Sequence, residues 1–533
     1  MKLNLIDKTI AYFSPSAGVE RAKKRSQLDY YNGGYGNPDQ GYITNISSKP
    51  TMRGWGATAN DVNFDIIPKL DAIRASSRDL AMNAPLVSAT LDRFQQNTIG
   101  NGLILKPIIN YKYLKLTEED AKTWEQNISD RFYAWAKSIF SDVELTNNFH
   151  ENAALCFYNL LLSGDVFILL LPNRYQNNTG FNICLKVVEA DHCTSQFSID
   201  TSIIAGVEID SYGAPIAYHF RALDNNFYNY QTKRIPRFNS LNQQQVLHMF
   251  LKKRPGQKRG VSIFAPVIES LKQLTRYKGA ELDAAVVNAM FTVFIKNTNN
   301  GGLQSGYSPL GMMGAGDNAA TTGNLPGDEN VYELGKANII ELPQNQDISL
   351  ADPRHPNSGF PAFYQACVEE LGATVGVSPE MVMMKFSSSF SAAKAAIQEA
   401  WKTFKFYRTF CENKYYNPIY ESWLTSEILT GNIVADGFFD NLTTREAWLG
   451  KSWIGSKQGM IDPLRETQAS VLRVDNRLST REQEYTREGD WDDAMRDFKK
   501  LDDLLTELNI QPKAQMDTEI LKNQDTTNDI VNN

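Results

Sequence analysis

The chain has 533 residues, of which 42% are hydrophobic and 22% are charged, with a formal net charge of −7. Such a length exceeds one hydrophobic core and fits roughly two to four domains. The composition excludes collagen-like and disorder-dominated chains, and the negative charge argues against a protein that clamps nucleic-acid phosphates broadly.

The cysteine pattern and the apolar runs indicate the compartment. No CxxC pair occurs, which favours buried thiols in a reducing environment. The N-terminus lacks a secretory signal pattern, and the most apolar run, Val166–Leu171, is far shorter than the roughly 20 residues that cross a bilayer. We therefore expect a soluble, cytoplasmic protein. The cysteines are Cys156, Cys184, Cys193, Cys367 and Cys411.

Residues 1–68 predict an N-terminal arm that is partly disordered. The segment 30–60 is rich in Tyr, Gly, Asn, Ser and Thr and has few apolar residues at regular spacing, so it buries too little surface to fold alone. The basic run Val19–Arg25 is typical of solvated charge, with nucleic-acid contact as the alternative.

Residues 69–262 predict a mixed α/β domain. Helical sequence from Lys69 to Gly102 is interrupted at Pro85, and a second helix starts at the capping residue Thr117. The segment 149–172 reads as a helix that ends at Gly164 and is followed at once by a strand. Further strands are expected at Leu185–Glu189, Ile203–Ile209, Ile216–Phe220 and Val246–Phe250.

The most basic segment of the chain, KKRPGQKRGVS, spans residues 252–262. Its side chains suggest an inter-subunit or DNA-facing patch, and a basic turn before a helix is the alternative. The residues assigned to this patch are Arg254, Gln257, Lys258 and Arg259.

Two helices are predicted around a polar, strand-containing module. A single-faced helix over 263–290 would extend ~42 Å. Residues 291–356 combine strand-like FTVFIK, NVYEL and NIIEL with a long Gly, Asn and Ser-rich segment, and helical sequence returns over 357–378.

The next stretch, Leu371–Trp401, predicts a loop over 379–391 between two helices. Gly376 and Pro379 stop the first helix, and Ser391 stands at the expected N-cap of the second. Helix then continues over 392–440, a helical region follows over 441–510, and the polar tail 511–533 is expected to be disordered.

Enzyme signatures are incomplete. Gly450–Ser452 reads GKS without the first glycine of a phosphate-binding loop, and the five histidines show no metal-ligand spacing. Ser391 and Lys394 form an SxxK pattern without its usual partner motifs, so a serine hydrolase remains the alternative function. We expect no enzyme activity, cofactor or metal.

These motifs, in this order, resemble the portal proteins of lambda-like tailed bacteriophages. The RPGQKRGVS segment is the most specific match, and Lys394 stands where the family has Arg. Further matching landmarks are Asn97, Gly100 and Gly102, Gly164–Phe167, Gly206–Asp210, His248–Phe250, Gly376–Pro379, Glu399–Trp401 and Ile461–Pro463.

The resemblance implies an α+β portal fold: wing, helical stem, clip over 291–356, tunnel loop over 379–391 and helical crown. It also implies a virion protein that assembles in the host cytoplasm as a ring of twelve at the capsid vertex. Double-stranded DNA passes through, and the partners are terminase, head-completion or tail proteins, capsid and scaffold. The residues assigned to the DNA channel are Met383, Lys385, Ser387, Ser388, Ser389, Phe390 and Lys394.

Overall fold

The computed structural model describes most of the chain between residues 55 and 507. The described residues are scattered positions of 9–24, then 50–52, 55–194, 202–221, 232–240, 242–289, 293–297, 346–350, 359–386, 389–456, 458–459, 462–485 and 491–507. They fall into two compact units, residues 1–68 with 254–256, and residues 69–253 with 257–533.

In the first unit, helix α3 (Val62–Asn83) begins within the predicted arm, six residues before the predicted end of that arm. The Arg254 guanidinium contacts the Asp65 carboxylate at 2.7 Å and donates to the Asn60 carbonyl at 3.1 Å. Asn63 Nδ2 donates to the Gly256 carbonyl. These contacts join the start of α3 to the basic segment 254–256. Between residues 25 and 54 of the arm, the described residues are those of the 3-10 turn η1 (Pro50–Met52).

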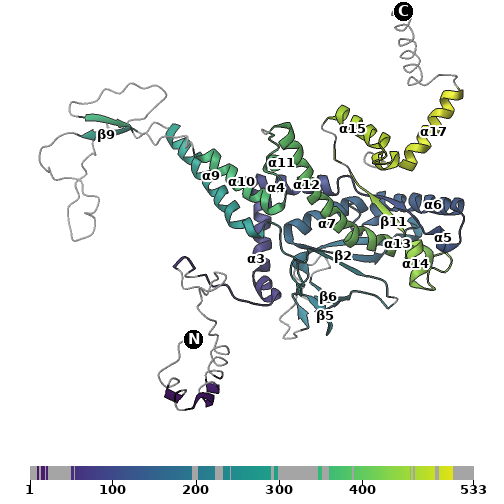
Figure 1. The fold of residues 1–533 in the computed structure, drawn as a ribbon, viewed down its shortest axis with the longest axis horizontal. Helices are drawn as coiled ribbons and strands as arrows, with labels where there is room; N and C mark the ends of the chain where they lie inside the picture. Colours follow the sequence, from purple (N-terminus) through teal and green to yellow (C-terminus); the bar gives the residue numbers. More distant parts are fainter. Residues whose placement is uncertain are drawn as a thin grey trace, which may run out of the picture. The chain divides into compact units, whose positions relative to one another are not determined.

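The second unit is built from helices on small antiparallel sheets, which confirms the α+β class (Figure 1). A three-stranded sheet has the order β3–β2–β8, and a four-stranded sheet has the order β4–β5–β6–β7. The strands are β2 (Asp165–Pro172), β3 (Ile183–Glu189), β4 (Ile203–Ile204), β5 (Val207–Ile209), β6 (Pro215–Arg221), β7 (Thr232–Pro236) and β8 (Val246–Phe250).

Local capping explains the helices around these sheets. α6 (Glu118–Lys137) begins after Thr117, whose hydroxyl accepts from the Asp120 N–H, as predicted. α7 (Phe149–Ser163) has a capping box from Asn148 and Glu151 and ends at Gly164, whose φ of +90° leads directly into β2. α4 (Pro85–Thr98) starts at Pro85, where the predicted interruption falls.

The core is a cluster of aromatic rings supplied by distant segments. Phe132 of α6 contacts Phe149, Trp423 and Trp453 with ring centroids 5.1 to 5.8 Å apart. Trp423 lies on α13 (Asn417–Leu429), which continues α12 (Phe390–Cys411) through a π-helical turn, Glu412–Tyr416. The predicted helix over 392–440 therefore begins two residues earlier and ends at Leu429.

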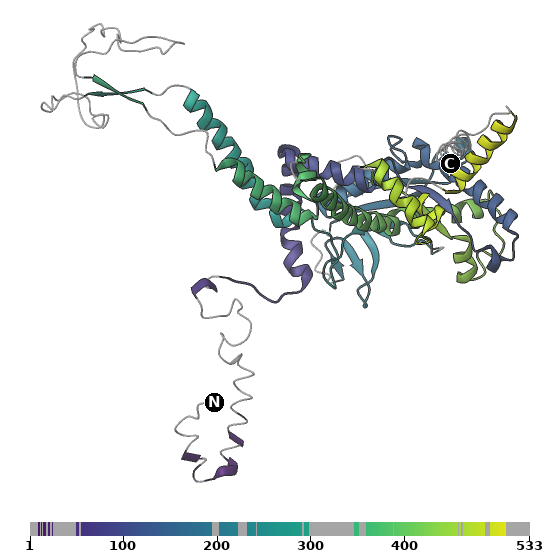
Figure 2. The same cartoon turned by 45° about the horizontal axis from the view of Figure 1, so that its top comes forward.

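The predicted long helix starts later than expected. Residues 265–267 form a 3-10 turn containing Pro266, and α9 runs over Ile268–Ala289. Phe264 is buried, and the Ile263 N–H donates to the Leu161 carbonyl, so this segment is held against α7 instead of joining the helix. The helix has 22 residues and a length of about 33 Å. α10 (Phe360–Val375) lies beside it in both views (Figures 1 and 2).

Strand β9 (Val293–Asn297) confirms the predicted FTVFIK strand and pairs antiparallel with β10 (Gln346–Leu350), which was not predicted. The predicted strands NVYEL and NIIEL lie outside the described residues.

The C-terminal region contains α14 (Leu442–Trp448), α15 (Pro463–Asp475), α16 (Arg481–Tyr485) and α17 (Trp491–Glu507). It is not wholly helical as predicted, because β11 (Lys451–Ile454) pairs antiparallel with β1 (Ile104–Pro107). The tail from residue 508 lies outside the described residues. Among the described helices, none combines the length and apolar character needed to span a membrane.

Candidate nucleic-acid interface

The loop between α10 and α12 is held at its base by two glycines. α10 ends at Gly376, which has a φ of +80° and donates its N–H to the Gly372 carbonyl. A Cβ on Gly372 would lie 2.6 Å from the Val377 carbonyl oxygen, so only glycine fits there. Thr403 Oγ1 donates to the Gly376 carbonyl at 2.8 Å, which ties α12 to this turn.

The predicted loop over 379–391 begins with a short helix, α11 (Pro379–Met383). Pro379 occupies its first turn, where a missing N–H costs no hydrogen bond. Buried Val382 anchors α11 to the core, and Met384 ends it with a φ of +53°. Residues 379–383 of the predicted loop are therefore helical, and α12 begins at Phe390.

The N-cap of α12 is Ser389, not Ser391 as predicted. Ser389 has extended backbone angles, and its hydroxyl accepts from the Ala392 N–H at 3.4 Å. Ser391 is exposed in the first turn of the helix. The sequence contains several adjacent serines, and each has a side chain suited to capping, so local pattern alone did not distinguish them.

The residues assigned to the channel fall into different environments. Lys385 is exposed and Phe390 is 50% exposed, whereas Met383 packs partly against the core. Lys394 forms an ion pair with Glu466 of α15 at 2.9 Å between Nζ and Oε1. Ser389 is the helix cap, and Ser387 and Ser388 lie outside the described residues.

The loop also exposes two large apolar side chains that were not assigned to the site. Met384 is 54% exposed and Phe386 is 48% exposed. The sequence shows that these residues are apolar and close to Phe390, but not that they are exposed. Together with Lys385 they form an apolar tip with one cation.

The predicted basic patch is divided by the fold. Gln257 and Arg259 are buried, with exposed fractions of 4% and 2%, so a role on the surface does not fit them. Gln257 shapes its own segment, because its side chain accepts from the Lys253 N–H and donates to the Arg259 carbonyl. Lys258 Nζ donates to the Gly213 carbonyl at 2.5 Å.

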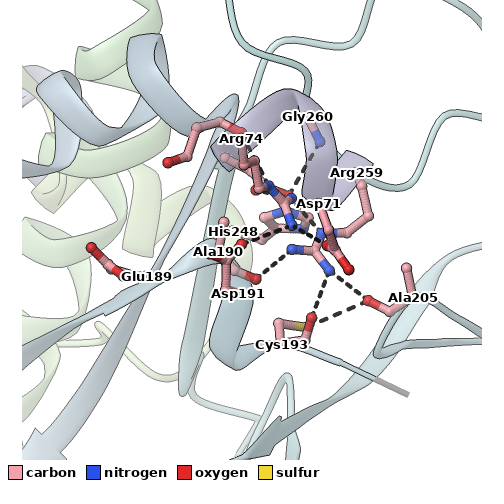
Figure 3. Close-up of polar contacts among 12 residues, drawn as sticks. Asp71, Arg74, Glu189, Ala190, Asp191, Cys193, Ala205, His248, Arg259 and Gly260 are labelled. Atoms are coloured by element: carbon pink, nitrogen blue, oxygen red, sulfur yellow. Dashed lines mark hydrogen bonds and ion pairs between the residues drawn. The ribbon is translucent and has the colours of Figure 1, made fainter. Parts of the chain in front are cut away.

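Arg259 is the centre of a buried charge cluster (Figure 3). Its Nε contacts Asp165 Oδ2 at 2.6 Å, and its other nitrogens donate to the carbonyls of Ala190, Cys193 and Ala205. Arg74 of α3 contacts the second oxygen of Asp165 at 2.7 Å. The guanidinium fork thus joins β2 to the loops around the two sheets.

The protonation states follow from this arrangement. Burial would raise the pKa of Asp165, but Arg259, the His248 hydrogen bond and Arg74 outweigh burial and hold that pKa well below its usual range. Burial lowers the pKa of His248, despite the opposing effect of Asp165. The cluster is therefore a neutral imidazole beside an ionised carboxylate between two arginines.

Two glycines, Gly164 and Gly260, allow the segments before β2 and after β8 to approach closely. A Cβ on Gly260 would lie 1.9 Å from the Gly164 carbonyl oxygen, and a Cβ on Gly164 would lie 2.4 Å from the backbone of Val261. The backbones of the GD and RG dipeptides therefore cross in direct contact. The glycine at position 260 of the RPGQKRGVS segment is therefore required by this internal backbone contact.

The contacts of Lys394 do not support the SxxK pattern as a catalytic pair. Lys394 Nζ, the base that a hydrolase of the SxxK type would need beside Ser391, pairs with Glu466 instead. Over the part of the chain that the structure describes, no group of three His, Cys, Asp or Glu side chains is placed to hold a metal ion.

The sequence is similar to a known protein family and to individual members of it. A model described as phage portal protein, lambda family, matches residues 48–408. The portal protein of Escherichia phage N15 and portal protein B of Escherichia phage lambda are each 24% identical over 487 residues. The alignments cover 87% of this chain, and 88% and 87% of the respective relatives.

Two solved structures that resemble this chain come from gene transfer agent (GTA) particles. A chain of the native GTA virion has a TM-score of 0.40 at 11% identity, covering 79% of this chain and 89% of that chain. A chain of the native GTA neck, computed with C12 symmetry, has a TM-score of 0.41 at 11% identity, covering 77% and 92%.

Proposed function

Because the chain belongs to the lambda family of phage portal proteins, we propose that it forms the ring at one capsid vertex through which DNA is packaged and ejected. The family match over residues 48–408 is the observation that carries this proposal. A ring of twelve copies requires a heterologous interface, in which two different surfaces of each copy meet. The ring belongs to the virion and assembles in the host cytoplasm.

The tip of the α11–α12 loop is the proposed contact with double-stranded DNA. Met384, Phe386 and Phe390 are apolar and about half exposed, and Lys385 is exposed beside them. A phosphate backbone is held by many cations, and each phosphate contact adds to affinity. One lysine at each loop tip, in a chain of net charge −7, suits DNA that must slide.

The remaining partners are assigned by region. We assign residues 291–356, which include the β9–β10 pair, to contact with terminase during packaging and with head-completion or tail proteins afterwards. Capsid and scaffold proteins are the further proposed partners. This role needs no catalytic group, cofactor or metal from the chain.

Light scattering combined with negative-stain microscopy of the purified protein tests the ring. We expect particles with a central hole and a mass several times that of the 60.0 kDa chain. A protein that stays monomeric at every concentration, also when scaffold is added, would contradict the proposal.

A packaging assay tests the loop within assembled rings. Lys385→Ala and Phe386→Ala should leave ring mass unchanged and alter the DNA packaging rate, because both side chains are exposed. Lys405→Ala, at an exposed position of α12, is the matched control. Unchanged packaging in both loop variants would remove these residues from the channel contact.

A further inference from the structure

A polar cavity of about 310 Å³ lies beside β6 and β8, away from the α11–α12 loop. Four cationic residues line it from separate segments: Arg237 follows β7, Lys252 and Lys258 follow β8, and Lys414 lies in the π-helical turn. No Asp or Glu is among its lining residues. The positive charge is therefore gathered by tertiary structure, not by one basic run.

Carboxylates that neighbour the lining residues are engaged elsewhere. Asp165, behind His248, is taken up by Arg74 and Arg259. Glu208, next to the lining residue Val207, is held by Arg234 and His219. These acids therefore have little capacity left to neutralise the cavity.

Further acids near the cavity have their own partners. Asp210 accepts from the N–H groups of Tyr212 and Ala214 and thereby shapes the β5–β6 turn. Glu412, next to the lining residue Asn413, interacts electrostatically with Arg408. In the part of the chain that the structure describes, Lys252 and Lys414 form no ion pair, so both ammonium groups remain available to a ligand.

The walls of the cavity are held in place before any ligand arrives. Lys258 Nζ donates to the Gly213 carbonyl and joins the β5–β6 turn to the segment after β8. The side chain of Gln257 uses both its polar atoms within its own segment. His248 is buried between Asp165 and Phe167, whose ring lies 4.2 Å away between centroids. Such a pre-formed site spends little free energy on ordering when it binds.

We propose that this cavity binds a phosphate group through Lys252, Lys414 and Arg237. Lysine and arginine donors in one concave site suit the several oxygens of a phosphate, and bringing an anion there relieves the repulsion among the cations. The volume lies at the lower end of the range for small-ligand sites and accommodates more than one phosphate. The phosphate comes either from a small phosphorylated compound or from a nucleic-acid backbone. The site does not depend on the proposed channel function.

Calorimetric titration of the full chain with pyrophosphate at low ionic strength tests the proposal. We expect saturable binding that the double variant Lys252→Gln, Lys414→Gln weakens by at least about tenfold, since each lysine contributes a charged hydrogen bond. The control variant Lys253→Gln, Lys405→Gln removes the same charge from exposed lysines outside the cavity and should bind as the wild type does. All four positions are exposed, so folding should be retained in both variants.

A labelled DNA duplex, measured by fluorescence anisotropy with and without pyrophosphate, identifies the source. Competition that depends on Lys252 and Lys414 would support a nucleic-acid phosphate. Pyrophosphate binding without competition would support a small phosphorylated compound. Absence of saturable pyrophosphate binding, or an equal loss in both double variants, would overturn the proposal.

Discussion

At the scale of single residues, Arg259 shows how a motif can mislead about position. It lies within the most basic segment of the sequence, yet its guanidinium is buried against Asp165 and three backbone carbonyls. Burying an arginine is costly unless every donor finds a partner. Where the backbones of Gly164 and Gly260 cross, these acceptors lie within reach of the guanidinium, so Arg259 serves the internal structure of the protein.

Asp165→Asn should destabilise the protein by about 3–5 kcal/mol, because it leaves Arg74 and Arg259 buried without their shared counter-charge. Urea unfolding at neutral pH measures this loss. Glu118→Gln breaks an exposed ion pair with Lys122 and serves as the control, with little expected change. A similar unfolding midpoint for both variants would show that the cluster does not need the carboxylate's charge.

His150 should contribute to the pH dependence of the free energy of unfolding. Burial and the nearby Lys137 lower the pKa of His150 from 6.5 to about 4. Between these values the unfolded chain binds a proton that the folded chain does not, so stability falls as pH drops from 6.5 towards 4. His150→Gln should remove on the order of 2 kcal/mol of that decline. Urea titrations at pH 7.5 and 4.5 measure it, and parallel losses in wild type and variant would contradict it.

At the scale of elements, the start of α12 differs from the start that the local sequence pattern predicted. Several serines in this run have side chains that could cap the helix. In the structure α12 begins at Phe390, and the preceding residue, Ser389, is the cap. The choice sets how many residues remain between α11 and α12.

Ser389→Ala should destabilise the first turn of α12 by about 1 kcal/mol, since the Ala392 N–H loses its acceptor. Hydrogen exchange at the Ala392 and Ala393 amides reports this locally, and exchange there should become roughly fivefold faster. Ser391→Ala is the matched control and should leave exchange nearly unchanged. The reverse order of effects would restore Ser391 as the cap.

At the scale of the whole molecule, α17 has an exposed apolar face that no contact within the described part of the chain covers. Met495, Phe498, Leu501 and Leu504 follow one another at intervals of three residues, and each is between 36% and 52% exposed. Such a stripe is costly in water and commonly marks a protein interface. In the proposed ring, a neighbouring copy would cover it.

Leu501→Gln should therefore lower the fraction of assembled rings several-fold, because apolar area buried between copies contributes to assembly. Light scattering at a series of concentrations measures the fraction. Lys499→Gln, an exposed polar position on the same helix, should assemble as the wild type does. Equal assembly of all three proteins would exclude this stripe from the interface.

The sequence by itself predicted most elements that depend on nearby residues. The cap at Thr117, the interruption at Pro85 and the passage from helix to strand at Gly164 all rest on contacts within a few positions. The ordered landmarks also identified the family that the comparison confirmed. Local propensity and motif order need no knowledge of distant partners.

Tertiary structure alone decided which residues face inward and which distant strands pair. β11 forms only against β1, and Arg259 is buried only because Asp165 and three carbonyls surround it. The cavity cations likewise converge from segments that are far apart in the chain. Long-range pairing and burial depend on the free energy of the packed whole, which no short window of sequence contains.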